Sequence, residues 1–390
     1  MNFVSFCVLF IIFSLNSFAD ANYSGFSKFE LLNLKSLNDN SESIGAFQIN
    51  RISLLNDLNE QVSLEFSYEL SQVYIPKQDD ERSFFEASAM ENFYRVIDSN
   101  RVIYRDQKNY YLMQNFDRLL VSVTGEVQTL VFGRQQVSFG SGRTVNPTDI
   151  FTPFKFNTID TEVRNGVDGI RYRQQFLEMG QIDLGVVFGD NFKSEKSAAF
   201  LAIKFPSFHS LEAQPILIHF QKASLIGLEL NANLLDASWW LEGASVKSEN
   251  EDGYLRWVSG IERQLTPNLS MYLEYYHNGA GSLETQNYSR LAETFAYKYG
   301  RVFLLGREYL NWGSQWLITP LHSVSFTWKV NLLDGSDFVA SQWEWNFKEN
   351  LYLNLGGYLG FGKKSDDRSI LNSEFGDQGV ILYSMLRYYF

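Results

Sequence analysis

The sequence predicts an all-β protein, a single transmembrane antiparallel up-and-down β-barrel of about 18 strands. Three observations predict this fold. Apolar and polar residues alternate along segments of about 9–12 residues, a length that suits a tilted membrane crossing. Short and long connections alternate along the chain, and aromatic residues gather near the ends of the segments.

The alternation is clearest in two segments, Val62–Leu70 (VSLEFSYEL) and His322–Val330 (HSVSFTWKV). Successive side chains of a strand point to opposite faces of a sheet. Each segment therefore has one apolar face and one polar face, as expected for strands that meet two different surroundings.

Two architectures fit such strands. A soluble sandwich buries the apolar face against a second sheet, whereas a membrane barrel turns that face toward lipid and keeps the polar face inside. The predicted strands are longer than the roughly 5–6 residues typical of globular proteins, which favours the barrel. An open sheet edge cannot face hydrocarbon, because each unpaired backbone group costs several kcal/mol, so the sheet must close on itself.

The connections give the order of the strands. Tight turns alternate with longer links, which is the arrangement of short periplasmic turns and long extracellular loops in outer-membrane barrels. A count of 16 strands also stays open, since the stretch 199–232 is the hardest to divide. The predicted strands are 26–37, 44–55, 61–74, 116–124, 127–139, 167–178, 182–189, 199–205, 215–221, 224–232, 237–246, 254–264, 269–277, 306–318, 322–331, 338–347, 350–361 and 379–390.

Composition excludes several classes of protein. A mean hydropathy of -0.19 argues against a helical membrane bundle. The formal charge of -12 over 390 residues argues against a nucleic-acid binder, which needs a basic face. No metal-ligand spacing, phosphate-binding loop or nucleophile motif occurs, so neither a cofactor nor an enzymatic function is expected.

The first residues predict an export signal. Phe3–Leu15 is apolar but too short to cross a bilayer as a helix, and Ser17-Phe18-Ala19 has small residues where a signal peptidase cleaves. We expect residues 1–19 to be a signal peptide, with Ala21 as the other cleavage position, and residues 20–390 to form one barrel domain. The only cysteine, Cys7, then lies in the removed segment, so the mature chain has no disulfide.

Two features carry a resemblance to known families. The last strand ends in Tyr388-Tyr389-Phe390, which resembles the C-terminal assembly signal of Gram-negative outer-membrane porin-like barrels. The stretch from Gly133-Arg134-Gln135 to Asn146-Pro147-Thr148-Asp149 is similar to one in barrels loosely related to alginate-export-type channels. The resemblance implies a location in the outer membrane, contact with its lipid and lipopolysaccharide, and insertion by the barrel-assembly machinery through Tyr388 and Phe390. Assembly into a homo-oligomer stays open.

The loop 140–166 is the candidate constriction of the pore. Counting from this loop along its flanking strands, we expect Arg134, Arg171 and Arg173 at a similar depth on the inner wall. The loop's own acids are expected either to pair with these arginines and hold the loop down, or to leave them free to select anions. The predicted pore-lining residues are Arg134, Gln136, Arg143, Arg164, Arg171, Arg173, Asp149, Asp160, Glu162, Glu65 and Glu69.

These features predict a passive diffusion channel for small hydrophilic solutes, anionic or sugar-like. The alternatives are a polysaccharide-export or other specialised channel and, less favoured, an outer-membrane enzyme or an adhesion scaffold.

Overall fold

The computed structural model describes residues 21–35, 42–75, 93–98, 101–105, 109–249, 251–365 and 371–390. The predicted signal peptide, its cleavage positions and Cys7 lie outside these ranges. Within them, no helix is long and apolar enough to cross a membrane.

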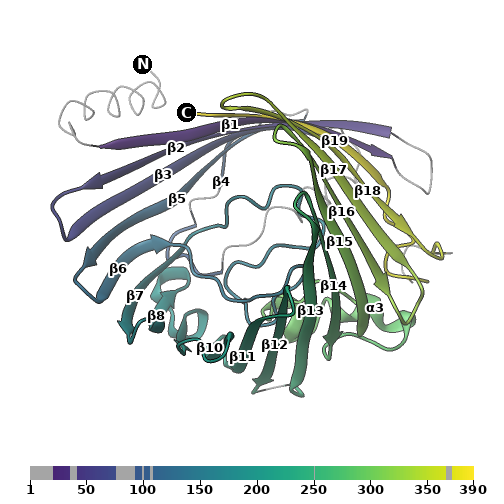
Figure 1. Cartoon of the computed structure of the whole chain (residues 1–390). Coiled ribbons are helices and arrows are strands. Elements are labelled where there is room, and N and C mark those ends of the chain that lie inside the picture. The colour runs from purple at the N-terminus through teal and green to yellow at the C-terminus, as the bar shows by residue number, and fades with distance from the viewer. Residues whose placement is uncertain are drawn as a thin grey trace.

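The chain forms a closed antiparallel barrel of 18 strands, as the sequence predicted (Figure 1). The first strand pairs with the second and also with the last, so no edge of the sheet stays open. The barrel strands are β1 (Asn22–Lys35), β2 (Glu42–Asp57), β3 (Val62–Tyr74), β5 (Tyr110–Thr124), β6 (Gln128–Gln135), β7 (Val167–Phe176), β8 (Gly180–Phe188), β9 (Ala198–Lys204), β10 (Leu211–Phe220), β11 (Ala223–Leu234), β12 (Ala237–Ser248), β13 (Tyr254–Thr266), β14 (Leu269–Asn278), β15 (Glu308–Thr319), β16 (His322–Asn331), β17 (Asp337–Lys348), β18 (Leu351–Phe361) and β19 (Val380–Tyr389).

Each predicted strand corresponds to one of these, and three details differ. β5 begins six residues before the expected start, at Tyr110 rather than 116, and pairs there with a short extra strand, β4 (Arg101–Arg105). β6 ends at Gln135 rather than 139, two residues after Gly133, whose φ is 111°. Pro215 lies inside β10, whereas we expected it at the start of a strand. The pairing of β10 with β9 begins at Ile216, so the missing N–H of Pro215 interrupts no hydrogen bonds between these two strands.

The connections follow the expected alternation with one clear exception. Two-residue turns with positive φ join β11 to β12, at Leu235 and Asp236, and β10 to β11, at Gln221 and Lys222. The first lies on the short-turn side as predicted, but the second lies on the long-loop side. Its φ values of 47° and 65° match the twist of paired strands, so the hairpin needs no longer loop.

The two chain ends of the barrel meet at the seam between β1 and β19. Gly25 and Phe390 exchange both backbone hydrogen bonds, at 2.9 and 3.1 Å. A side chain at position 25 would come within 2.3 Å of the Arg51 carbonyl and 2.6 Å of the Phe390 ring, so only glycine fits this close approach. Tyr388 and Phe390 are both about half exposed.

The outer face of the barrel is an apolar belt. Alternate residues such as Ile226, Leu217 and Leu386 are 64%, 49% and 40% exposed, while the residues between them point inward. In a water-soluble protein such a continuous exposed apolar surface would be unfavourable. The apolar side chains therefore face lipid, and the polar rows face the lumen.

A single charge on the belt should hinder insertion. Phe66 lies on the outer face of β3, opposite the exposed Leu119, whereas its neighbour Glu65 faces the lumen. Phe66→Arg should cost about 2–4 kcal/mol, the range for arginine near the bilayer midplane. Urea titration of refolding into vesicles would measure the loss. Glu65→Arg, one residue away, is the matched control and should refold normally; equal losses in both variants would contradict this assignment of faces.

Candidate functional site

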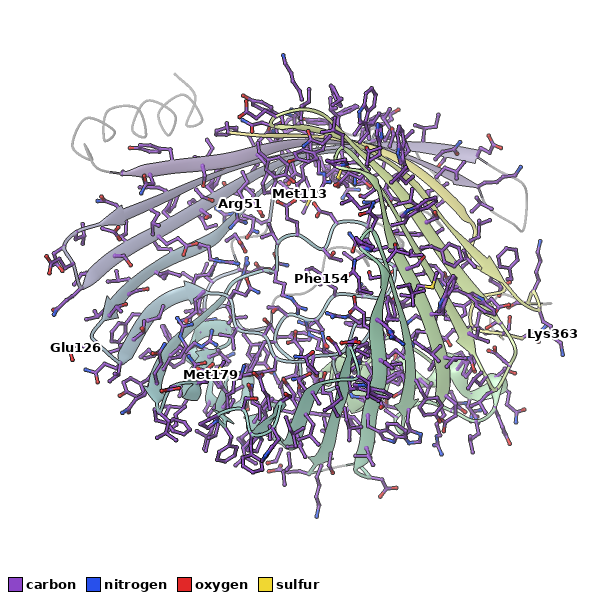
Figure 2. All side chains as sticks on the ribbon, in the orientation of Figure 1. Arg51, Met113, Glu126, Phe154, Met179 and Lys363 are labelled. Carbon is purple, nitrogen blue, oxygen red and sulfur yellow. The ribbon has the colours of Figure 1, made fainter. Side chains whose placement is uncertain are left out.

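The segment between β6 and β7, residues 136–166, folds into the barrel interior, and we call it the inward loop (Figure 1). Figure 2 shows Phe154, from this loop, near the centre of the ring, with Arg51 of β2 on the surrounding wall. The loop contains the predicted constriction, residues 140–166. Its contacts show how its position is held.

Three buried glutamates of the barrel wall bind the first part of the loop through hydrogen bonds. Glu229 of β11 accepts a hydrogen bond from the Gly140 N–H at 2.8 Å, and Glu242 of β12 accepts from the N–H groups of Ser141 and Thr148 at 2.9 and 2.7 Å. Glu274 of β14 accepts from the N–H of Arg143 at 2.7 Å. Carboxylates that accept several backbone N–H groups form strong, charge-assisted hydrogen bonds. These three side chains fix the path of the loop.

The last part of the loop is tied to the barrel seam. Lys28 of β1 places its ammonium 2.6 Å from Asp160 and 2.6 Å from Glu162. The Tyr389 hydroxyl of β19 donates to Glu162 at 2.7 Å. Lys28 is 2% exposed, so this pairing is little weakened by solvent.

The anchors lie on opposite walls. In the ring of strands, β1 and β11 are separated by eight strands on each side, namely β2, β3 and β5–β10 on one side and β12–β19 on the other. The inward loop therefore crosses the lumen from one wall to the other. Between these ends, the buried Asp149 pairs with Arg164, which also donates to the Thr152 carbonyl at 2.8 Å.

An apolar core fills the lumen beside β8–β12. Phe139, Ile150 and Phe151 of the loop pack against inward side chains of these strands, including Phe200 at ring distances of 5.5 and 5.7 Å. Tyr94 packs on Phe151 from a separate segment, 93–98. This side of the barrel is closed, so any passage must run elsewhere.

A cavity of about 440 Å³ lies between the inward loop and β13–β19, and we call it the cationic cavity. Among the described residues that line it, none is aspartate or glutamate. Aromatic rings, among them Phe154, Phe303 and Tyr383, alternate with hydroxyl groups along its wall. Its charged residues are Arg143, Lys155, Arg164, Arg256, Arg301 and Lys329.

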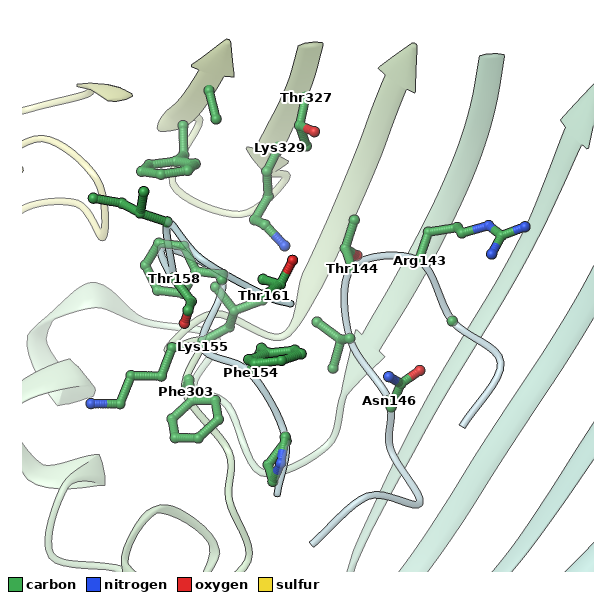
Figure 3. Close-up of a pocket in the computed structure, with 18 of the residues that line it drawn as sticks. Arg143, Thr144, Asn146, Phe154, Lys155, Thr158, Thr161, Phe303, Thr327 and Lys329 are labelled. Carbon is green, nitrogen blue, oxygen red and sulfur yellow. The ribbon is translucent and has the colours of Figure 1, made fainter. Parts of the chain in front are cut away.

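Lys329 is the most deeply placed of these cations. It is 2% exposed, and its ammonium has no hydrogen-bond partner within the described part of the chain. Figure 3 shows the ammonium directed toward the loop segment that carries Thr161. A buried ammonium that lacks a hydrogen-bond partner can still donate hydrogen bonds to an anion in the cavity.

The neighbouring cations are crowded. Burial, and then the nearby Arg301, lower the pKa of Lys155 on the inward loop from its ordinary value. Arg256 donates to the Pro147 carbonyl at 2.7 Å, while its Nε has no partner among the described residues. Arg143 pairs with Glu262 at 2.5 Å, and Arg164 pairs with Asp149. Cations therefore outnumber carboxylates along the described lining of the cavity.

A second cavity of about 540 Å³ lies against β2–β7, and we call it the polar cavity. Glutamines, serines and both signs of charge line it. Arg171 is paired with Asp183 of β8 at 2.8 Å, and Arg173 lies beside it. Its charged residues are Arg51, Arg118, Arg171, Arg173, Glu65 and Glu162.

The predicted pore-lining residues thus fall into separate places. Arg143 and Arg164 line the cationic cavity, whereas Glu65, Gln136, Glu162, Arg171 and Arg173 line the polar cavity. Asp149 and Asp160 hold the loop. Glu69 pairs with Arg51 at 2.7 Å and accepts from Asn115 at 2.7 Å, so it belongs to the wall network.

Arg134 differs from its expected position. It lies opposite Asp168, with which it pairs at 2.6 Å, while Arg171 and Arg173 lie opposite Val131 and Thr129. It also lies opposite Leu119, which is 55% exposed on the outer face. The expected ladder of three arginines is therefore not formed, because Arg134 shares the outward parity of Phe132.

Several residues of the site were not singled out from the sequence. Lys329, Glu229, Glu242 and Glu274 lie on the polar faces of their strands, and strand parity says nothing about what an inward residue contacts. No sequence pattern pointed to Lys155, Arg256 and Arg301. They come together at the cationic cavity because three separate segments fold against one another.

An extracellular cluster closes over the cationic cavity. Phe375 of the loop 362–379 packs on Phe156 of the inward loop at 5.6 Å. Its neighbour Glu374 is buried and accepts hydrogen bonds from the Tyr309 hydroxyl at 2.5 Å and the Leu305 N–H at 2.8 Å. Burial raises the pKa of Glu374 from 4.5 to about 7.

This shift predicts a pH dependence. Because the pKa of Glu374 is higher in the folded state than in the unfolded state, its protonated carboxyl group stabilises the folded loop. This stabilisation is complete below about pH 4.5 and is lost as the pH rises through about 7, at a cost of about 3 kcal/mol. We expect limited proteolysis of this loop to be faster at pH 8 than at pH 5.5. In Glu374→Gln the two rates should converge once corrected for the protease's own pH profile; an undiminished difference would assign the effect elsewhere.

The closed ring and the apolar outer belt define a membrane-spanning β-barrel. No protein-family model and no curated protein matches the sequence. Solved structures do match it over nearly their whole length. Acinetobacter baumannii OccAB2 is similar with a TM-score of 0.61 and 8% identity over 95% of this chain and 98% of that one.

Two more structures show the same likeness. Acinetobacter baumannii OccAB1 has a TM-score of 0.58 and 12% identity over 95% of this chain and 97% of that one. Pseudomonas aeruginosa OccK5 (OpdH) has a TM-score of 0.57 and 9% identity over 95% of this chain and 98% of that one. At these identities the likeness establishes the fold. The narrower resemblance of residues 133–149 to alginate-export-type channels stays a prediction.

Proposed function

We propose that this protein is an outer-membrane channel through which small anionic solutes diffuse passively. The cationic cavity carries the proposal, since six cations and no carboxylate line the described part of its wall. A lumen with a narrow polar passage and one sign of charge selects permeating ions by size and charge. The match to Occ structures supports the barrel on which the proposal rests.

The location is part of the same proposal. The lipid-facing belt requires a membrane, and the Tyr388 and Phe390 end is suited to insertion by the barrel-assembly machinery, with lipopolysaccharide against the outer-leaflet side. Residues 136–166 occupy the centre of the lumen and are anchored on both walls, which supports small solutes as cargo over a polysaccharide chain.

The test is the reversal potential of the purified, refolded protein in a planar bilayer under a salt gradient. We expect discrete current steps and a reversal potential on the anion side. Steps with a cation preference would overturn the assignment of anions, and the absence of steps from heat-modifiable, folded protein would overturn the channel function itself.

A further inference from the structure

The two cavities share no lining residue, although both lie in the lumen of one barrel. The segment 161–164 of the inward loop stands between them. Thr161 and Arg164 line the cationic cavity, while Glu162 and Val163 line the polar cavity. The side chains of this four-residue segment are thus divided between the two compartments.

This partition is firmly held. Glu162 is fixed to Lys28 and Tyr389 at the seam, and Arg164 is fixed to Asp149 inside the loop. Each of these contacts is a charge-assisted hydrogen bond, the stronger kind in proteins. Lys28 is 2% exposed and the Asp149 side chain is fully buried, so neither pair is readily exchanged for water.

The compartments also differ in chemistry. The cationic cavity has aromatic rings and cations, whereas the polar cavity has four arginines together with Glu65 and Glu162, and amide groups from Gln135 and Gln136. Arg171 and Arg51 are neutralised by Asp183 and Glu69. Arg118 is also paired, with Asp117, while Arg173 retains an Nε without a hydrogen-bond partner in the described structure, so most charges of this cavity are paired and, with the amides, suit dipolar groups.

We infer that the barrel conducts through two parallel passages. The passage along β13–β19 takes small anions, and the passage along β2–β7 takes uncharged or zwitterionic polar solutes such as small sugars. This inference rests on the proposed channel function and extends it. The inward loop then acts as a wall between two routes, rather than as a single narrow ring.

Blocking the passages one at a time tests this. In a Cys7→Ser background, Ser325→Cys places a thiol on the cationic cavity and Ser122→Cys places one on the polar cavity. A bulky neutral methanethiosulfonate reagent is added, and single-channel conductance is recorded before and after. Ser224→Cys is the control, because it shares the outer face with Ile226. Heat-modifiable gel mobility verifies that each variant is folded.

With two passages, each modification should roughly halve the conductance, since the cavities are similar in size. The double variant should lose nearly all of it. Modified Ser325→Cys should also lose its anion preference, while modified Ser122→Cys should slow the entry of a neutral pentose into proteoliposomes more than it lowers chloride current.

Other outcomes overturn the inference. Near-complete block by either modification alone means a single shared route. A double variant no more blocked than the stronger single variant means that one cavity is a dead end. Both results require an unmodified channel that conducts, so they differ from a failure of the proposed function, in which no variant conducts.

Discussion

Replacing Lys329 with glutamate should move the ion preference of the channel strongly toward cations. The ammonium of Lys329 is buried in the cationic cavity without a hydrogen-bond partner among the described residues, so its charge acts on whatever passes. Reversing one charge at close range in a partly dehydrated pore changes the interaction by an amount on the order of 1–3 kcal/mol. The anion-to-cation permeability ratio should therefore fall about tenfold or more.

The reversal potential under a salt gradient measures this change. Lys329→Met, which retains the length of the side chain without its charge, should give an intermediate ratio. Lys348→Glu changes the net charge equally at an exposed strand end outside the cavity, and should leave the ratio unaltered. If Lys348→Glu and Lys329→Glu shift the potential alike, the overall charge decides selectivity and the cavity does not.

Removing the carboxylate of Glu242 should release the inward loop. Glu242 accepts hydrogen bonds from the N–H groups of Ser141, Gly142 and Thr148, at 2.9, 3.2 and 2.7 Å, and is fully buried. An unsatisfied buried donor costs about 1–3 kcal/mol, so Glu242→Ala should weaken this attachment by several kcal/mol. We expect a larger mean conductance with added current noise, as the loop samples positions away from the wall.

Two variants define the cause. Glu242→Gln retains one acceptor oxygen, so its current noise should be close to that of the unmodified protein. Glu262→Ala removes a carboxylate from the next strand. Within the described structure this carboxylate pairs with the side chain of Arg143, so its removal should leave the noise unchanged. A quiet, unaltered channel in Glu242→Ala would show that the packing of Phe139 and Phe151 alone holds the loop.

The sequence determined the barrel. Every predicted strand is present because lipid imposes a simple rule: alternate residues must be apolar and no backbone group can be left unpaired. The same alternation placed Glu65 and Arg171 on the inner face. The expectation for Arg134 was wrong, because Arg134 has the outward parity of Phe132 and pairs with Asp168 at the end of its strand.

Tertiary structure alone decided what the lumen contains. Glu242 and Lys329 have the same inward parity, yet one holds the loop and the other faces an open cavity. The difference arises because backbone N–H groups of the inward loop reach Glu242 on β12, whereas the cationic cavity lies between the loop and Lys329 on β16. Contacts between segments a hundred residues apart follow from how a loop folds inside a closed ring, and period-two alternation along a strand contains no information about that path.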